Sequence, residues 1–598
     1  MKKWLIGIGI LALIIVAILV LYPGGRDRLT TAGKAVVEVV SLPRGHERSL
    51  PDLVPARAGF FFRVRGFREV WEKITGSEFF RELTGSRLWE EEKIEEKLKA
   101  FRDEFEDRNG FALDRSGVME LAGEDIILAA LPADPAGPAA VVLISRVGLK
   151  ARLMEVLVRM GDGWQKTEDR ILREEEYGGE KVFLISPSES FPFHSAYTFI
   201  DDYLVAAVSE EPCRPVIEQV IDLARRGEGK ALSDSPEFEA ARRAASLSFG
   251  ESLEWYLKLA LFIRQSGRGA VSFSAPGGGF PLPEWGEEMM RQLSAWRTIA
   301  GSLDYAGGIR ARAVITLEEE NVAPASAGKT ALGTLRGFAP AGSMIFAEFP
   351  QEPSLLWEKV SLAIGGLARQ GITAPLAGLR NWERAVGVNV KDDIIPVLDD
   401  RWALVSEGIT GEEFFPVPPL SLICPVVDRM KAAAFMERIV AWSAVSHNLK
   451  PVKEEYHGVE ITLLSGLPFL QPAYALTGDY LIVGSSRDLL TRMIDVRSGS
   501  RGGIGEDSYF REVVSKIGAA DGGLIYLNGE QLVRSLISLG KWYFPYQRMA
   551  PEEPILPEEF YRNTIAPLLR LCAVCKAAGI GITREKNLVR EDCFIYIQ

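Results

Sequence analysis

The strongest constraint on the fold of this chain is a repeat within it. The segment AYTFIDDYLV at 196–205 aligns without a gap with AYALTGDYLI at 473–482. Further pairs of short matching segments keep the same order along the chain: 54–61 with 339–346, 175–179 with 454–458, and 282–284 with 556–558. Ordered matches at nearly constant spacing indicate a tandem duplication, so the sequence predicts two homologous lobes.

The repeat also predicts how the chain is divided. A chain of 598 residues exceeds the usual size of one domain, which agrees with two lobes. The expected parts are a short tail at 1–3, an apolar anchor at 4–22, a linker at 23–49, a first lobe at 50–321, an Ala- and Gly-containing linker at 322–334, and a second lobe at 335–598.

Residues 4–22 form an uncharged apolar run, WLIGIGILALIIVAILVLY. About twenty such residues are needed for a helix to cross a hydrocarbon core. A cleavable signal peptide is the alternative, but its apolar region is usually about 7 to 15 residues and ends at a small-residue site. We therefore expect an uncleaved transmembrane anchor. Lys2 and Lys3 favour a cytoplasmic N-terminus, with the body periplasmic or extracellular in a single-pass protein.

The patterns within a lobe predict strand pairs separated by helices. Strands are expected at 125–131 and 139–145, and hairpins at 171–185 and 197–208. Helices are expected at 88–108, which is rich in Glu, Lys and Arg, at 149–160, which is amphipathic, and at 213–226. Because short turns join adjacent strands, the predicted fold class is α+β with largely antiparallel sheets and packed helices.

A further set of features resembles a known group of proteins. Each lobe has a Pro-led turn before its first strand, and similar helix starts occur at Asp234–Phe238 and Asp507–Phe510. A strand-to-helix step follows at Gly523–Asn528. With the apolar anchor, this arrangement resembles the uncharacterised bacterial membrane-anchored exported proteins classed as a domain of unknown function. The resemblance implies a cell-envelope location and carries over no functional residue.

Charge and glycine patterns argue against two common classes of ligand. The net charge is -12, with acidic and basic residues interspersed, so no basic stripe is available for nucleic acid. Acidic clusters such as Glu174–Glu176 and Asp399–Asp400 are interpreted as solvated surface. The glycine-rich segment at 499–505 lacks the Lys and the preceding strand of a phosphate-binding loop, so we interpret it as a linker between helices.

The cysteine spacing leaves three interpretations open. Cys572 and Cys575 have the CxxC spacing at the end of an apolar helix that starts near Ile565, and Cys593 lies in the last predicted strand. Buried thiols, a disulfide from Cys593 to Cys572 or Cys575, and a metal or redox site all fit this spacing. The four His residues form no metal-binding pair at helical spacing. We assign no catalytic, metal-binding or cofactor-binding residue.

The segment KWYFPYQR at 541–548 is the candidate interface. It places Trp542, Tyr543, Phe544 and Tyr546 among cations, and Pro545 predicts that the segment is not a continuous helix. Aromatic rings flanked by Lys and Arg suit a membrane interface or the binding site of a partner. Packing of these rings in the core of the second lobe is the alternative.

These features favour a non-catalytic, membrane-tethered envelope protein that binds another envelope protein or a surface polymer through its exported lobes. A carrier of lipid or another apolar ligand, with a groove between sheet and helices, is the first alternative. An envelope hydrolase, whose catalytic groups would lie far apart in the sequence, is the second.

Overall fold

The structure is a computed structural model that describes most of the chain after residue 48. Among the described residues, no helix combines the length and apolar composition needed to cross a membrane. The predicted anchor at 4–22 lies outside the described residues and stays a prediction. The described residues are 49–77, 80–81, 84–85, 96, 99–100, 103, 123–135, 137–147, 172–187, 192–245, 252–259, 274–275, 278–279, 296–305, 308–318, 333–350, 352–369, 374–409, 417–467, 470–518, 520–549, 558, 561–566, 569, 573–585 and 587–597.

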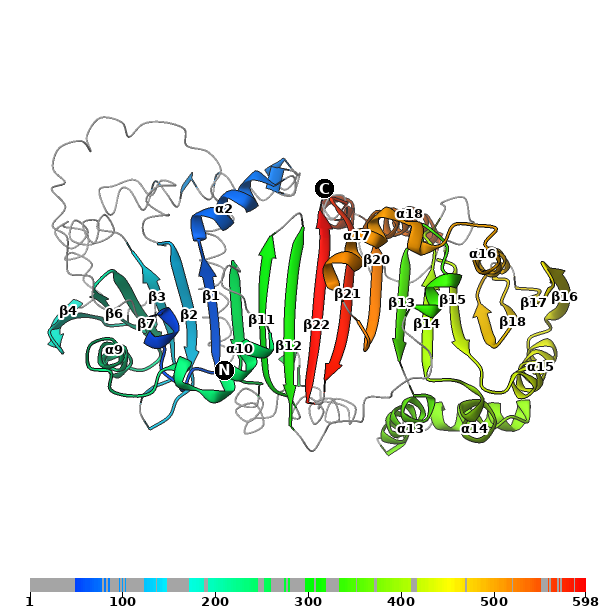
Figure 1. Ribbon diagram of the computed structural model, residues 1–598, viewed down its shortest axis with the longest axis horizontal. Helices are drawn as coiled ribbons and strands as arrows, with labels where there is room; N and C mark the ends of the chain where they lie inside the picture. The colour runs from blue at the N-terminus through cyan, green and yellow to red at the C-terminus, as the bar shows by residue number, and fades with distance from the viewer. Residues whose placement is uncertain are drawn as a thin grey trace. The chain divides into compact units, whose positions relative to one another are not determined.

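Residue contacts divide the chain into two compact units. Unit 1 comprises Met1–Phe262 with Thr298–Tyr305, and unit 2 comprises Ile263–Arg297 with Ala306–Gln598. Each unit has antiparallel strands with helices packed on them (Figure 1). The predicted fold class, α+β with largely antiparallel sheets, is confirmed.

Unit 1 contains nine strands that the structure pairs into one antiparallel sheet, in the order β11-β8-β1-β2-β3-β7-β6-β5-β4. The strands are β1 Phe60–Arg65, β2 Asp125–Leu131, β3 Ala140–Arg146, β4 Leu172–Tyr177, β5 Glu180–Ile185, β6 His194–Ile200, β7 Tyr203–Ser209, β8 Leu253–Leu257 and β11 Trp296–Tyr305. The helices are α2 Phe67–Gly76, α9 Arg214–Ile221 and α10 Pro236–Ala244, with single turns at Leu50–Leu53, Asp222–Arg226 and Leu232–Asp234.

The predicted hairpins of unit 1 are confirmed as β4–β5 and β6–β7. Their turns need a left-handed backbone, which Gly178 and Gly179 supply in the first turn and Asp201 in the second, at φ 50°. The predicted strands at 125–131 and 139–145 are β2 and β3. The predicted helix at 213–226 is confirmed as α9 and the turn that follows it, whereas the helix at 149–160 and most of that at 88–108 lie outside the described residues.

Unit 2 repeats this strand order with two strands more, as β12-β22-β21-β20-β13-β14-β15-β19-β18-β17-β16. The strands are β12 Ile309–Leu317, β13 Ile345–Pro350, β14 Arg401–Ser406, β15 Leu420–Pro425, β16 Lys450–Tyr456, β17 Val459–Ser465, β18 Ala473–Thr477, β19 Tyr480–Gly484, β20 Gly523–Asn528, β21 Cys575–Glu585 and β22 Leu588–Ile597. Residues 309–317 fall within the expected first lobe, yet their contacts place β12 in unit 2, where it pairs with β22.

The described part of unit 2 also contains helices that pack on its sheet. They are α13 Pro353–Arg369, α14 Ala374–Val386, α15 Arg429–Ser446, α16 Arg487–Ser498, α17 Ser508–Ile517 and α18 Gly529–Met549, with single turns at Thr334–Phe338, Val390–Ile394, Ile395–Val397, Ile504–Glu506 and Tyr561–Ile565. A separate two-residue pair, β9 Ser274–Ala275 and β10 Gly278–Gly279, completes the described strands. The predicted linker at 499–505 does join two helices, α16 and α17.

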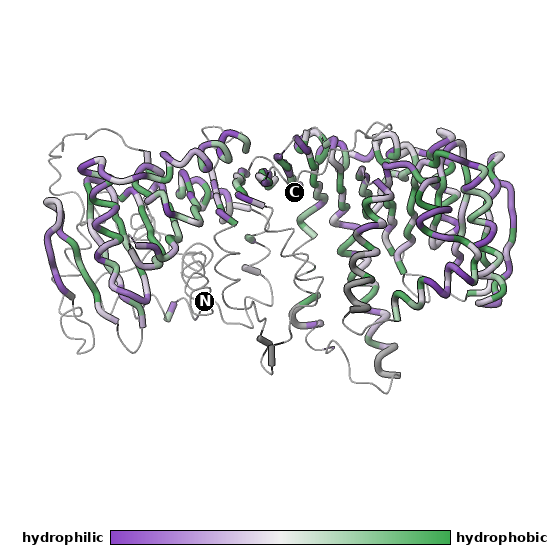
Figure 2. The backbone as a smooth tube through the Cα atoms, turned by 90° about the horizontal axis from the view of Figure 1, so that it is seen from below, coloured by the Kyte–Doolittle hydropathy of each residue, from purple (hydrophilic) through white to green (hydrophobic). Residues whose placement is uncertain are grey.

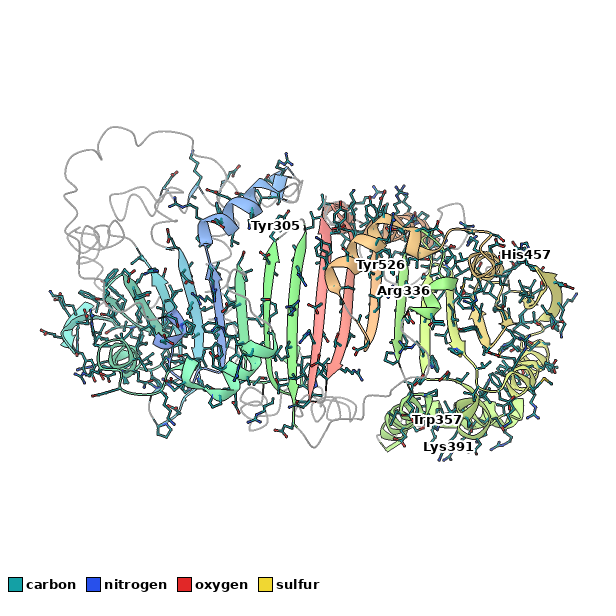
Figure 3. The ribbon with its side chains drawn as sticks, in the orientation of Figure 1. Tyr305, Arg336, Trp357, Lys391, His457 and Tyr526 are labelled. Atoms are coloured by element: carbon teal, nitrogen blue, oxygen red, sulfur yellow. The ribbon has the colours of Figure 1, made fainter. Side chains whose placement is uncertain are left out.

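The two units bury the same aromatic cluster. In unit 1 the ring of Phe238 lies edge-on to those of Phe61 and Tyr256, with centroids 5.4 and 5.0 Å away. In unit 2 Phe510 takes the same place between Phe346 and Tyr526, at 6.1 and 5.1 Å, and Arg336 lies 5.6 Å from the Phe510 ring (Figure 3). Each cluster joins one strand, β1 or β13, to one helix and to the strand beside it, which agrees with the predicted duplication.

Oppositely charged residues occupy matching positions in the two units, with the two charges exchanged. In unit 1 Arg63 on β1 donates two hydrogen bonds to Asp125 at the start of β2. Strand register places Glu348 and Arg401 at the equivalent positions of β13 and β14. Glu348 is fully buried and accepts the backbone N–H of Gly333, at 2.9 Å. Burial raises the pKa of the Glu348 carboxyl, and the Arg401 charge opposes that rise.

The outer edge strand of each sheet is charged. β4 reads LREEEY and β16 reads KPVKEEY, and both appear in the hydrophilic colour (Figure 2). Charged side chains on an edge strand discourage pairing with the strands of another chain. These two edges are therefore poor templates for strand addition.

The unit 2 sheet has two faces with different cover. On the inner face, Phe346, Ile423 and Ile482 are buried in a core that includes residues of α16 and α17. On the outer face, Cys424 and Leu481 join a second core with residues of α14 and α15. Because side chains alternate along each strand, neighbours such as Ile423 and Cys424 enter different cores.

Candidate functional site

One row of residues crosses the outer face of the unit 2 sheet. Each member lies directly opposite the next, through nine adjacent strands from β18 to β12: Tyr474, Val483, Leu422, Leu404, Ala347, Ile525, Ile580, Cys593 and Ala311. Directly opposed residues point to the same side of a sheet. We call these nine residues the apolar row. Eight steps between strands, at about 4.8 Å each, give it a length of about 38 Å.

The apolar row is open to water in places. Ile525 is 40% exposed and Val483 38%, although a paired strand flanks each of them on both sides. On the inner face their neighbours Leu524, Tyr526 and Ile482 are almost completely buried. A side chain inside a sheet keeps such exposure only where no second layer covers it. The outer face therefore presents uncovered apolar surface around Ile525 and Val483, which is typical of binding surfaces, whereas Tyr474 at the end of the row is buried in the core with α14 and α15.

Unit 1 has an equivalent row with a partial cover. Its directly opposed residues run from β6 to β11 as Tyr197, Ala206, Leu143, Leu128, Phe62, Trp255 and Gly301. Phe62 and Leu143 pack against a small core that includes Phe67 and Trp71 of α2. The two units therefore share the row itself and differ in the large side chains that it carries.

The apolar row was not predicted from the sequence. Strands such as β20 and β19 carry apolar residues at successive positions, LIYL at 524–527 and LIV at 481–483, and such runs are typical of strands buried on both faces. The sequence did contain one indication of the row. These apolar runs occur in strands that short turns join into antiparallel pairs, and such strands usually have one polar face. Sequence alone does not show which of the two apolar faces is covered.

The predicted interface at 541–548 lies on α18. Trp542 and Tyr543 are half-buried, and the side chain of Tyr546 lies outside the described residues. Phe544 is only 6% exposed, and its ring lies 5.1 Å from that of Tyr543 and 4.9 Å from that of Tyr561. Phe544 thus anchors the segment from within, as the core-packing alternative expects, while Trp542 and Tyr543 keep part of their surface in water.

The prediction that Pro545 prevents a continuous helix here is wrong. α18 runs through it from Gly529 to Met549. A proline removes one backbone donor and is expensive inside a helix. Pro545 is exposed and lies within the last two turns, so little of the helix depends on the lost hydrogen bond, and the packing of Phe544 holds the backbone in place.

A cavity of about 370 Å³ lies between α18 and the turn at Tyr561–Ile565. Ile537, Phe544 and Ala566 supply apolar walls, and Lys541 and Arg562 supply cations. Arg562 forms an ion pair with Glu558 at 2.5 Å. Gly540 lies where α18 passes Tyr561, and a methyl group there would stand 2.2 Å from the tyrosine ring.

We expect Gly540→Ala to lower the free energy of unfolding by about 1 to 3 kcal/mol, because the added methyl overlaps Tyr561 and forces it out of place. The matched control is Gly378→Ala in α14, where an added methyl meets no atom within 4 Å. That change should be neutral or stabilising by up to about 1 kcal/mol, since Ala is the better helix former. Thermal and denaturant unfolding measure both; equal effects of the two changes would contradict the close packing.

A disulfide between Cys593 and Cys575, one of the three interpretations that the cysteine spacing left open, is not formed. Both residues lie on paired strands, but Cys593 is opposite Ile580 and Cys575 is opposite Ile597. Five strand residues separate the two positions by about 16 Å, whereas a disulfide needs Cα atoms within about 7 Å. Cys575 also begins β21 and does not end a helix. Cys572 lies outside the described residues, so its pairing with Cys593 stays a prediction.

Cys213 and Cys424 are buried core residues, and burial raises the pKa of each thiol to about 12. The thiolate is the reactive form, so both should resist iodoacetamide in the folded protein at mildly alkaline pH. Both should react once guanidinium unfolds the chain. Mass spectrometry of the peptides measures this, and rapid alkylation of either residue in the folded protein would contradict its burial.

No group of three or more His, Cys, Asp or Glu side chains in the described ranges is arranged to hold a metal ion. Comparison of the chain with models of protein families, with curated proteins and with solved structures finds no match.

Proposed function

We propose that this chain is a non-catalytic, membrane-tethered protein of the cell envelope that binds another envelope component through the apolar row. The observation that carries the proposal is the exposure of Ile525 and Val483 in the interior of a sheet. Apolar surface left in water costs free energy, roughly 25 cal/mol for each Å². A partner that covers the row recovers this energy.

The direction and length of the apolar row favour a partner that binds along the row and therefore crosses the strands. The row runs perpendicular to the strands for about 38 Å and contains no charged side chain. The exposed Leu420, on β15, extends the same face by two residues. The charged edges β4 and β16 leave the sheet face, rather than strand addition, as the mode of binding. The apolar segment at 4–22 supplies the tether, and two lobes derived by duplication form the exported body.

The test uses photoreactive crosslinking in intact cells that make the full-length chain. The crosslinking residue replaces Ile525 or Val483, and the control replaces Val445, a residue of α15 that is 86% exposed. We expect both row positions to capture the same envelope protein or polymer, and Val445 not to capture it.

Lipid adducts at both row positions, in place of a protein or polymer, would instead support the carrier function. The absence of hydrogen-bonding side chains from most of the row is the observation that favours this second candidate. Failure of either row position to capture more than Val445 does would overturn both functions.

A further inference from the structure

The outward side of α15 is apolar. Its exposed apolar residues recur at intervals of four, seven and four, which keeps them on one side of a helix: Met430, Ala434, Ala441 and Val445. We call these four residues the α15 face. Met430 is 79% and Val445 86% exposed. The opposite side of α15 buries Phe435, Met436 and Val440 in a core of unit 2. A surface helix normally presents polar side chains to water, so apolar residues on both sides indicate a further element that covers α15.

Exposed charges of opposite sign flank the middle of the α15 face. Glu437 and Arg438 are consecutive, so they point about 100° apart around the helix, one to each edge of the face. Their surroundings agree with this placement. Arg438 donates a hydrogen bond to the backbone oxygen of Gly387, just after α14, at 2.9 Å, whereas Glu437 lies within electrostatic range of Lys453 in β16. Lys453 is itself paired with Glu460, and neither Glu437 nor Arg438 forms an ion pair with any described residue.

We propose that the α15 face binds the α15 face of a second copy of this chain, with the two helices parallel. In a parallel pair with twofold symmetry, each edge of one helix faces the opposite edge of the other, so Glu437 of each copy faces Arg438 of the other copy. In an antiparallel twofold pair, like edges face each other, which would bring the two Glu437 side chains together and the two Arg438 side chains together. The charges therefore favour the second copy as the occupant and fix its direction.

The side chains of the α15 face suit close packing of two helices. Ala434 and Ala441 are small, so the two backbones can approach to about 8 Å between helix axes, and Met430 and Val445 pack at the two ends. The contact runs for about 22 Å along the helix. An interface of this length is small, but the predicted anchor at 4–22 confines both copies to one membrane and so raises their effective concentration.

The proposed dimer is independent of the apolar row. The α15 face points away from the sheet, because the opposite side of α15 packs on it. Val445, the control position in the crosslinking test of the row, should therefore capture a second copy of the chain and no other envelope component.

The test uses oxidative crosslinking of the full-length chain in membranes. A434C and A441C each place a thiol on the α15 face, and A377C places one at an exposed position of α14 as the control. Facing Cα atoms of two closely packed helices lie within the distance of about 7 Å that a disulfide needs, so A434C and A441C should each give roughly tenfold more linked dimer than A377C. The unchanged chain, with its five native cysteines, sets the background.

The direction of the pair is tested with A434C and A441C made together in one membrane, on chains with tags of different size. In a parallel pair these two positions are about 10 Å apart along the helix, so a disulfide between the two differently tagged chains should be rare. In an antiparallel pair they face each other, and this mixed dimer would be the main product.

Charge exchange separates a second copy from other occupants. In the A441C background, E437R and R438E should each reduce the dimer by roughly threefold, because each replaces two facing pairs of opposite charge by two of like charge. The double change E437R/R438E should restore at least half of the loss. The control is E512K/K516E, which reverses an exposed ion pair on α17 and should leave the dimer unchanged. The unfolding curve of each variant checks that the fold is intact.

Four results would overturn the proposal. They are a dimer of A441C no more abundant than that of A377C, a mixed dimer of A434C with A441C as the main product, a double change no better than either single change, and a disulfide from A441C to a different protein in place of the dimer.

Discussion

Phe510→Ala is expected to lower the free energy of unfolding of unit 2 by about 3 to 5 kcal/mol. The Phe510 ring is 2% exposed and lies between Phe346 of β13 and Tyr526 of β20. Its loss opens a cavity at the point where α17 meets the sheet, and neither neighbour is flexible enough to fill it. Hydrogen exchange should show the change as faster exchange of the amides in β13 and β20.

The equivalent aromatic cluster of unit 1 supplies a matched control. Phe238→Ala removes the equivalent ring of unit 1, between Phe61 and Tyr256, and should speed exchange in β1 and β8 in the same way. Each change should act first on the unit that contains it. If Phe510→Ala leaves the exchange of β13 and β20 as it is in the unchanged chain, the aromatic cluster does not hold the sheet to α17.

Arg63→Glu should destabilise unit 1 by about 3 to 5 kcal/mol, because it leaves Asp125 without its cation and places a second carboxylate beside it. Arg63 and Asp125 are largely buried, with side chains 11% and 20% exposed. The double change R63E/D125R should recover at least half of this loss. Unit 2 already accommodates that polarity at the equivalent positions, with Glu348 and Arg401.

Denaturant unfolding of the two single changes and the double change forms a complete cycle. The control is the exposed pair Lys453 and Glu460 on the β16–β17 hairpin, 2.9 Å apart, where reversal should change stability by less than about 1 kcal/mol. A double change no more stable than Arg63→Glu alone would show that the two units do not tolerate the same exchange of charge.

Local patterns allowed the hairpins and helix starts to be predicted. Gly178, Gly179 and Asp201 mark turns that require a left-handed backbone, and the repeat reproduces such turns with His457 and Gly478. Side-chain caps at Ser235 and Asp507 begin α10 and α17, where the sequence shows the same helix start twice. Turns and helix caps depend on residues that are close together in the sequence, so the sequence was sufficient to predict them.

Features that depend on distant contacts could not be predicted in the same way. The exposure of Ile525 depends on which elements lie over β20, and the state of Phe544 depends on Tyr561, in a different element. The helix around Pro545 persists because tertiary packing outweighs the local cost of the proline. The register of β21 on β22 separates Cys575 from Cys593, and this register cannot be predicted from the spacing of the cysteines along the chain.

The pairing of β12 with β22 has a consequence for the order of folding during synthesis. Ile309 pairs with Ile595, 286 residues later, and the strands between them build the rest of the unit 2 sheet. At about 5 to 20 residues per second, a ribosome needs roughly 15 to 60 seconds to make that length of chain. During that interval the edge of β12 that pairs with β22 has no partner strand. Arg310 and Arg312 place charge on β12, and charged side chains on an unpaired strand oppose aggregation. The last ten residues of β22 therefore set the time at which the sheet of unit 2, and the apolar row with it, becomes complete.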